Sequence, residues 1–223
     1  MPEDSMPGTS FADLRLGDFV DRLASAEPVP GGGSASAVAA SLGAALVAMV
    51  AALSQGRPKY AEHAALHARA IEVGQRLSRR FLELADEDAA AYARFAAAIK
   101  LPKETDQERS ARSTALAVAA RAASEVPLAT VEACLELVVT AEVLAGRSNV
   151  NASSDLNVAA QLGEAAARGA AENVLVNLPA VGDAEFSGEV TAQVMDWLDT
   201  IATLAAETHQ AVRSGSPRDP VPA

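Results

Sequence analysis

Apolar residues recur every three or four positions along almost the whole chain, which is the spacing of one face of an α-helix. No stretch shows the period-two alternation of a half-buried strand, and no segment repeats at intervals of 20–50 residues. Clusters of Pro, Gly, Asn and Ser interrupt the pattern and divide it into separate helices. The pattern predicts helices over residues 11–26, 34–55, 59–100, 106–145, 156–177 and 185–213.

Local signals refine these helices. Thr105 has the residue type of an N-cap for the helix that follows it. Gly74 marks a point at which the long third helix can kink, and Pro127 must kink or restart the fourth. We therefore expect a flexible N-terminus over 1–10, a single helical domain over 11–213 and a disordered Pro-rich tail over 214–223.

Composition supports an all-α fold of five to six helices, several of them long. Alanine accounts for 52 of the 223 residues and aromatic residues for only 4%. Alanine is the best helix former and a poor strand former, which excludes a β-sandwich or barrel. A core of such small side chains requires close helix approach. Because long Ala-rich helices have more apolar surface than one small bundle can cover, we expect a homodimer.

Charge and cysteine content restrict the partners and the cellular location that we expect for this chain. The formal net charge of −11 repels phosphate backbones, so a nucleic-acid partner is not expected. The only cysteine, Cys134, lies among apolar residues and is predicted to be a core residue. With no internal disulfide available, we expect a reducing, cytoplasmic location. The acidic N-terminus, broken by Pro and Gly, is not typical of a targeting peptide.

One segment is long and apolar enough to cross a membrane. Residues 35–53 carry no charge, which meets the length criterion for a membrane-spanning helix. The segment is mostly alanine, contains Ser36, Ser41 and Gly43, and lacks flanking Trp or Tyr anchors. We interpret it as a helix buried inside the bundle and expect no membrane partner.

Asp88 is the main candidate for chemistry. It lies on the apolar stripe of the long third helix, four residues from both Leu84 and Tyr92, whereas Asp86 falls on the opposite face. A carboxylate on a buried stripe is desolvated, which raises its pKa and suits it to proton transfer. The alternative is a structural carboxylate tied into a hydrogen-bond network.

Three further groups of polar or small residues are candidates for ligand binding. The PGGGS segment lets a ligand approach the backbone at a helix N-terminus, although its simplest role is a turn with Gly33 or Ser34 as N-cap. In the polar loop after residue 148, Ser154 or Asp155 can cap the next helix, whereas Asn149 and Asn151 are less easily explained as caps. Asn173 lies in a seam of small residues, where it either contacts a ligand or bonds another helix.

Metal or serine-hydrolase chemistry is not expected. His63 and His67 have the i, i+4 spacing of a helical metal pair, but no third ligand matches, and we interpret them as solvated surface histidines. The chain contains neither GxSxG nor CxxC.

Taken together and in order, these motifs resemble the cyclodeaminase/cyclohydrolase family of folate enzymes. The matching stretches are PVPGGGSASAVAASLGAALVAMV (28–50), LADEDAAAYARFAAAIKLPKET (84–105), SEVPLAT (124–130) and SNVNASSDLNVAAQLGEAAARGAAENVLVNL (148–178). The resemblance implies an all-helical homodimer, in a stand-alone bacterial form, that acts on a one-carbon tetrahydrofolate without a cofactor or metal. It also implies that Asp88, the second aspartate of DxD, is the proton donor and acceptor.

The resemblance further suggests a substrate-binding set around Asp88. Its members would form a wall of the folate site, hold pterin heteroatoms or bind the glutamate carboxylates: Gly31, Gly32, Gly33, Ser34, Arg57, Lys103, Asn149, Ser154, Asp155 and Asn173. Three positions depart from the family pattern: Gln55 replaces a tyrosine, and Ala171 and Glu172 replace an aromatic pair. These departures bear on the identity of the substrate more than on the fold.

The resemblance leaves two reactions open. One hydrolyses 5,10-methenyltetrahydrofolate to 10-formyltetrahydrofolate, and the other cyclises 5-formiminotetrahydrofolate with release of ammonia. We expect the first, because the chain shows no formiminotransferase segment. The alternatives are a non-catalytic helical dimer that binds folate or another small ligand, and a dimerisation scaffold with no ligand.

Overall fold

The computed structural model describes residues 10–218, and within them every regular element is a helix. The α-helices are α1 (Leu16–Leu23), α2 (Gly32–Ser54), α3 (Ala64–Ile99), α4 (Asp106–Leu144), α5 (Ser153–Val181) and α6 (Ala184–Ser214). Three 3-10 turns join them: η1 (Phe11–Asp13), η2 (Pro58–His63) and η3 (Val150–Ala152). The all-α prediction is confirmed.

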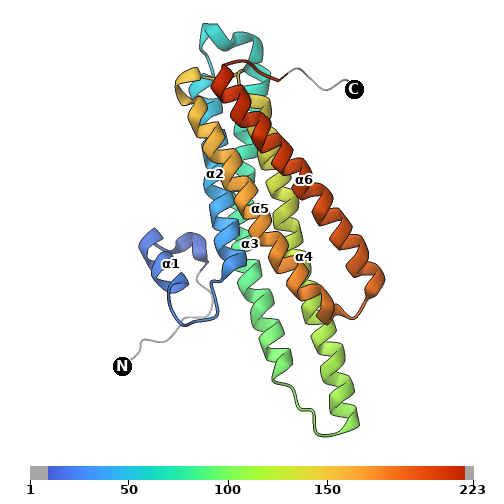
Figure 1. Ribbon diagram of the computed structural model, residues 1–223. Coiled ribbons are helices and arrows are strands. Elements are labelled where there is room, and N and C mark those ends of the chain that lie inside the picture. The colour runs from blue at the N-terminus through green and yellow to red at the C-terminus, as the bar shows by residue number, and fades with distance from the viewer. Residues whose placement is uncertain (1–9, 219–223) are drawn as a thin grey trace.

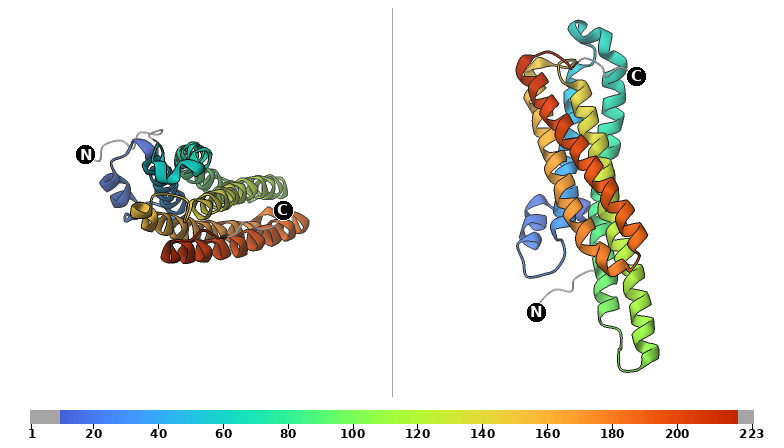
Figure 2. Two further views of the ribbon diagram at one scale, coloured as in Figure 1. Left: turned by 90° about the horizontal axis from the view of Figure 1, so that it is seen from above. Right: turned by 45° about the vertical axis from the view of Figure 1, so that its right-hand side comes forward.

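The helices form an elongated bundle. α2 packs against α3 and α5, α4 also packs against α3 and α5, and α6 lies along α4 and α5 on the outside (Figure 1). The α3–α4 hairpin extends beyond the end of the other helices, and α1 stands away from the bundle beside α2 (Figure 2). Cys134 lies in the core, as predicted.

Several predicted boundaries are wrong, for local reasons. The first helix is interrupted because Leu14 and Arg15 are extended between η1 and α1. α3 begins at Ala64 because residues 58–63 form η2. Neither Gly33 nor Ser34 is an N-cap, since α2 is already helical from Gly32 and Gly31 takes that place.

The extents of α4 and α5 also differ in part from the prediction. α5 begins at Ser153 after Ala152, so neither Ser154 nor Asp155 caps it. It continues past residue 177 through Pro179 and ends at Gly182, whose positive φ of 74° favours glycine. α4 begins at a capping box between Thr105 and Glu108, as predicted, and runs through Pro127 as one helix.

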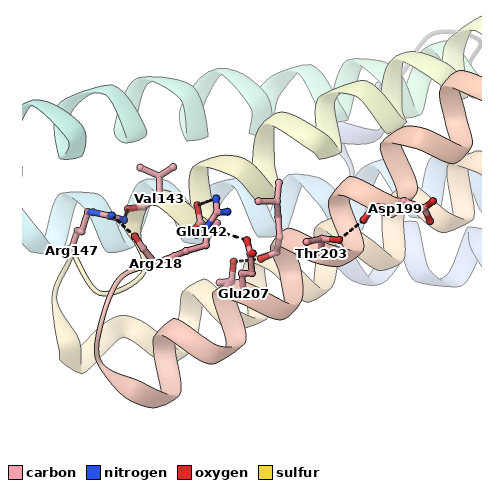
Figure 3. Close-up of polar contacts among 9 residues, drawn as sticks. Glu142, Val143, Arg147, Asp199, Thr203, Glu207 and Arg218 are labelled. Atoms are coloured by element: carbon pink, nitrogen blue, oxygen red, sulfur yellow. Dashed lines mark hydrogen bonds and ion pairs between the residues drawn. The ribbon is translucent and has the colours of Figure 1, made fainter. Parts of the chain in front are cut away.

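Part of the segment predicted to be a disordered tail packs against the bundle. The guanidinium of Arg218 forms ion pairs with Glu142 at 2.9 Å and with Glu207 at 3.1 Å (Figure 3). The backbone carbonyl of Arg218 accepts a hydrogen bond from the side chain of Arg147. Because the Glu142 side chain is only 5% exposed, Arg218 supplies the charge that this buried carboxylate needs. Residues 1–9 and 219–223 lie outside the described part of the chain.

α2 is the helix within residues 10–218 that is long and apolar enough to cross a membrane. In the structure it packs against α3 and α5, as the interpretation of a bundle helix requires. The contact with α3 is very close at Gly74. A Cβ added there would lie 2.7 Å from the carbonyl oxygen of Ala44 and 2.8 Å from the amide nitrogen of Ala48. Gly74 is thus a packing residue inside a continuous α3.

We expect Gly74→Ala to destabilise the fold by about 1–3 kcal/mol, because the new methyl group would force two backbones apart. The measurement is urea unfolding followed by circular dichroism. Gly188→Ala in α6 is the matched control, since nothing lies within 4 Å of its added Cβ; it should stabilise by about 0.4–1 kcal/mol. Equal effects of the two substitutions would contradict the packing role.

Candidate functional site

A cleft of about 280 Å³ lies where α2 begins, between that helix end, α3 and α5. Its floor includes the backbone of Gly31, Gly32 and Gly33, and its walls come from α3, α5 and Ala123 of α4. The apolar stripe of α3 explains its position. Leu77, Phe81 and Leu84 are buried, but beyond Asp88 α2 no longer covers the stripe, and Tyr92 is 43% exposed. Beyond Asp88, stripe residues therefore line the cleft.

Asp88 is half-buried in this cleft and lies against the first turn of α2. A Cβ built on Gly33 would lie 2.6 Å from both Cγ and Oδ2 of Asp88. No real side chain tolerates such a distance. Gly33 therefore leaves the space that the Asp88 carboxylate occupies, and a side chain at residue 33 would displace that carboxylate from its present position.

Ser34 holds the carboxylate from the same turn. Its hydroxyl lies 3.0 Å from Asp88 Oδ2 and 3.0 Å from the carbonyl oxygen of Ala85, and it is completely buried. Burial raises the pKa of Asp88 above its ordinary value, while hydrogen bonds from the Ser34 hydroxyl and backbone N–H act in the opposite direction. Burial is the larger effect, so the pKa of Asp88 lies above that of a solvated aspartate.

Two asparagines of α5 line the cleft opposite Asp88. Asn173 donates from Nδ2 to the carbonyl of Gly169, and Asn177 donates from Nδ2 to the carbonyls of Asn173 and Ala123. Neither Oδ1 receives a hydrogen bond within residues 10–218. The cleft therefore offers three acceptors, Asp88 and two amide oxygens, to a ligand with N–H donors.

Pro127 explains how Asn177 is positioned. Because proline has no N–H, it leaves the carbonyl four residues earlier, that of Ala123, without its helical partner. Asn177 donates to that oxygen at 2.9 Å. Sequence reasoning missed Asn177, although Pro127 in the middle of a predicted helix was the available signal.

The predicted site residues divide between two places. Asp88, Gly31, Gly32, Gly33 and Asn173 line the cleft. Ser34 lies behind it and contacts Asp88 rather than the cavity, so its predicted ligand contact is corrected to a positioning role.

The remaining predicted residues do not line this cleft. Arg57 follows the far end of α2, about 34 Å from Gly31 at ~1.5 Å per helical residue. Ser154 and Asp155 begin α5, which follows η3 at that same end. Lys103 is exposed in the α3–α4 loop. Because the length of α2 separates them from Asp88, one chain does not bring Arg57, Ser154 or Asp155 to the cleft, and Lys103 lies beyond the end of α3.

Asn149 has a structural role that sequence reasoning underestimated. It is 5% exposed and caps η3, since its side chain accepts from the Asn151 N–H. Its own N–H donates to Ser54 Oγ at the end of α2.

The two departures in α5 also lie outside the cleft, because Ala171 is buried in the core and Glu172 is exposed.

The contacts of Asp86 and His67 show that both side chains have structural roles. Asp86 accepts from the Ser10 hydroxyl at 2.6 Å and from the Phe11 N–H at 2.8 Å, so it anchors the N-terminal segment. The prediction of a solvated His67 is wrong: the ring is fully buried and its Nε2 lies 2.9 Å from the Arg147 carbonyl. Among the described residues no group of three or more His, Cys, Asp or Glu is placed to hold a metal ion.

Comparison with known proteins gives a consistent result. Residues 15–196 match the sequence profile of the formiminotransferase-cyclodeaminase family. A methenyltetrahydrofolate cyclohydrolase from Methylorubrum extorquens is 36% identical over 88% of this chain and 94% of its own length. A formimidoyltransferase-cyclodeaminase from Rattus norvegicus is 37% identical over 91% of this chain, which spans only 38% of that relative. The crystal structure of a formiminotetrahydrofolate cyclodeaminase from Thermotoga maritima superposes with a TM-score of 0.80 at 26% identity, over 91% of this chain and 98% of that one.

We expect Ser34→Ala to raise the pKa of Asp88 further, because a hydrogen bond that favours the charged carboxylate is removed. A pH titration of the Asp88 carboxyl carbon by NMR measures this. Ser36→Ala is the matched control, because the Ser36 hydroxyl donates to Gly32 on the same helix. An unchanged titration in Ser34→Ala would disprove the positioning role of Ser34.

Proposed function

The chain belongs to the formiminotransferase-cyclodeaminase family, and we propose that its cleft hydrolyses 5,10-methenyltetrahydrofolate to 10-formyltetrahydrofolate with Asp88 as the proton donor and acceptor. The single observation that carries this proposal is the carboxyl group of Asp88. It is half-buried, has a raised pKa and is held by Gly33 and Ser34 at the edge of a cavity. A folate one-carbon enzyme needs such a group.

The reaction moves one proton of the attacking water to N5 through Asp88 and releases the other proton of that water to the solvent. Water attacks the cationic methenyl carbon, and the ionised Asp88 takes the proton of that water as the C–O bond forms. The protonated Asp88 then gives that proton to N5 as the C–N5 bond breaks, and the remaining hydroxyl proton leaves to water as the C=O bond of the N10 formyl group forms. A carboxyl group whose pKa is raised by burial serves both steps better than a fully solvated one.

The remaining groups of the cleft suit the pterin ring. A reduced pterin carries several N–H donors, and the amide oxygens of Asn173 and Asn177 are acceptors without another partner among the described residues. Tyr92 and Phe95 line the same cavity and provide apolar area for the ring faces. Gly31 and Gly32 let the ring approach the backbone closely.

Cyclisation of 5-formiminotetrahydrofolate is the second candidate reaction for the same cleft. The structural similarity to the cyclodeaminase from Thermotoga maritima, which covers 98% of that chain, supports it. There N10 attacks the carbon of the protonated formimino group, and Asp88 takes the N10 proton as the new C–N10 bond forms. Asp88 then protonates the amino nitrogen, which leaves as ammonia as its C–N bond breaks and the methenyl cation forms. We favour hydrolysis because the cyclohydrolase relative matches at 36% identity over 94% of its length.

We also propose that the protein acts as a homodimer. The support is the number of large apolar side chains that one chain leaves uncovered on its helices, among them Leu42 at 55% and Leu16 at 70% exposure.

We expect Asp88→Asn to lower kcat for methenyltetrahydrofolate hydrolysis by roughly 10²–10⁴-fold, because the amide cannot relay a proton. The loss of methenyltetrahydrofolate absorbance measures this, in a buffer that slows spontaneous hydrolysis. Stability at neutral pH should not fall. A raised folded-state pKa means that ionised Asp88 opposes folding above that pKa, and asparagine removes this effect.

Asp86→Asn is the matched control, two residues away on the same helix and engaged with Ser10. It should keep kcat within a few-fold of wild type. Ammonia release from 5-formiminotetrahydrofolate, measured with the same variants, decides between the two reactions. Wild-type hydrolysis no faster than the blank would sink the cyclohydrolase proposal, and full activity in Asp88→Asn would sink the role of Asp88.

A further inference from the structure

Pro127 lies in the interior of α4, where proline is the least favourable residue. Its side chain is buried, and α4 continues on both sides of it. A proline at such a position removes one helical hydrogen bond, and its ring presses against the carbonyl four residues earlier. Alanine in the same place favours a helix much more than proline does. What Pro127 does provide is a free carbonyl, that of Ala123.

The Ala123 carbonyl holds the side-chain amide of Asn177. Asn177 Nδ2 donates to it at 2.9 Å across the contact between α4 and α5, and donates to the Asn173 carbonyl at 2.8 Å within α5. An amide nitrogen has two N–H groups, so both donors are used. Because a carbonyl oxygen can only accept, the amide cannot turn over without losing both hydrogen bonds. Oδ1 therefore remains the atom that Asn177 offers to a ligand.

Asn173 is held less firmly than Asn177. Its Nδ2 donates only to the Gly169 carbonyl, at 2.8 Å, and its second N–H has no acceptor within residues 10–218. This nitrogen lies beside the start of α2, since a Cβ built on Gly32 would be 3.8 Å from it. Asn173 can therefore give a ligand a donor as well as an acceptor, whereas Asn177 can only accept.

A fixed acceptor discriminates between ligands. Asn177 is half-buried and lines the cleft together with Asp88 and Ala123. A ligand N–H placed against its Oδ1 forms a hydrogen bond without any reorientation of the amide, which favours binding. A ligand oxygen or an unprotonated ring nitrogen at the same place meets a lone pair, and the amide cannot turn to offer its nitrogen instead. Such a site rejects a ligand without the N–H more strongly than an apolar wall would.

We propose that Pro127 is a positioning residue for ligand recognition: it locks Asn177 as a hydrogen-bond acceptor, and Asn177 thereby selects ligands that present an N–H to it. In the reaction proposed above, this N–H belongs to the reduced pterin ring, and that identity of the ligand rests on the proposed function. The lock itself does not, since it depends only on the contacts of Asn177 with the carbonyls of Ala123 and Asn173.

The lock is tested by hydrogen exchange of the side-chain amides, followed by NMR without ligand. In wild type the Nδ2 protons of Asn177 should exchange at least about tenfold more slowly than those of the exposed Asn151. Pro127→Ala supplies an N–H to the Ala123 carbonyl, so the Asn177 protons should exchange faster, while those of Asn173 stay unchanged. Equal exchange of the Asn177 protons in wild type and Pro127→Ala overturns the lock.

Recognition is tested by calorimetric titration with tetrahydrofolate, which carries no one-carbon unit and is not turned over. Asn177→Leu keeps the approximate size of the side chain but removes the acceptor, and should weaken binding by about 5–100-fold. Pro127→Ala leaves every residue that lines the cleft in place and should weaken binding by about 2–10-fold. In the hydrolysis assay both variants should raise KM and leave kcat within a few-fold of wild type, because the ground state and the transition state share this contact. Unchanged affinity in Asn177→Leu overturns the role of Asn177.

Stability separates the positioning role of Pro127 from a structural one. Because alanine favours the helix, Pro127→Ala should melt at a temperature no lower than wild type, so that weaker binding does not reflect unfolding. Pro179→Ala is the matched control. It also removes a proline from inside a helix, two residues after Asn177, but Pro179 is exposed and does not line the cleft. It should bind tetrahydrofolate like wild type, and a loss as large as that in Pro127→Ala overturns the specific role of Pro127.

A double-mutant cycle shows whether Pro127 acts through Asn177. The variant Asn177→Leu/Pro127→Ala should bind tetrahydrofolate no more weakly than Asn177→Leu alone, because the lock then has no amide to hold. Losses that multiply, as those of independent residues do, overturn the proposal.

Failure of this proposal differs from failure of the proposed function. If wild type binds tetrahydrofolate but catalyses neither folate reaction, the proposed function fails, whereas the affinities of the variants still decide the role of Asn177. If wild type is active and Asn177→Leu binds as tightly, only the selection by Asn177 is overturned. Wild type that binds no tetrahydrofolate overturns the ligand in both proposals, and amide exchange still decides the lock.

Discussion

The contact between the Asp88 carboxylate and the first turn of α2 is the constraint on which the site depends. The carboxylate occupies the place where a side chain on Gly33 would be, and the adjacent Ser34 donates to it. This contact defines where α2 must begin relative to α3. Because α2 begins there, it covers the apolar stripe of α3 only as far as Asp88. The stripe residues beyond Asp88 lie outside the core and line the cavity.

Small side chains elsewhere make that contact possible. α2 and α3 approach so closely at Gly74 that a single added carbon would meet the backbone of α2. The same closeness brings the start of α2 onto Asp88 fourteen residues further along α3. The alanine-rich composition and the geometry of the cleft are therefore linked, since larger core residues would separate the helices and remove the carboxylate from its donor.

Two opposing effects act on Asp88, and their balance suits proton transfer. Burial disfavours the charged form, whereas Ser34 favours it, and burial prevails. A fully buried carboxyl group without a donor would stay protonated, and a solvated one would stay ionised at neutral pH. Pro127 of α4 has an effect on the position of Asn177 in α5. It leaves the carbonyl of Ala123 without its helical partner, and the hydrogen bond that Asn177 donates to this carbonyl fixes the orientation of its side chain.

By itself, the sequence determined the helical class, most of the six long segments and Asp88 as the polar exception on an apolar stripe, because these depend on local periodicity. It could not determine that Ser34 positions Asp88, that Asn177 joins the site, or that Asn149, Ser154 and Asp155 lie at the far end of α2. Those facts depend on which helix ends meet and on the length of a rigid helix. Only tertiary structure decides this, since residues adjacent in a motif series can be separated by a whole helix in space.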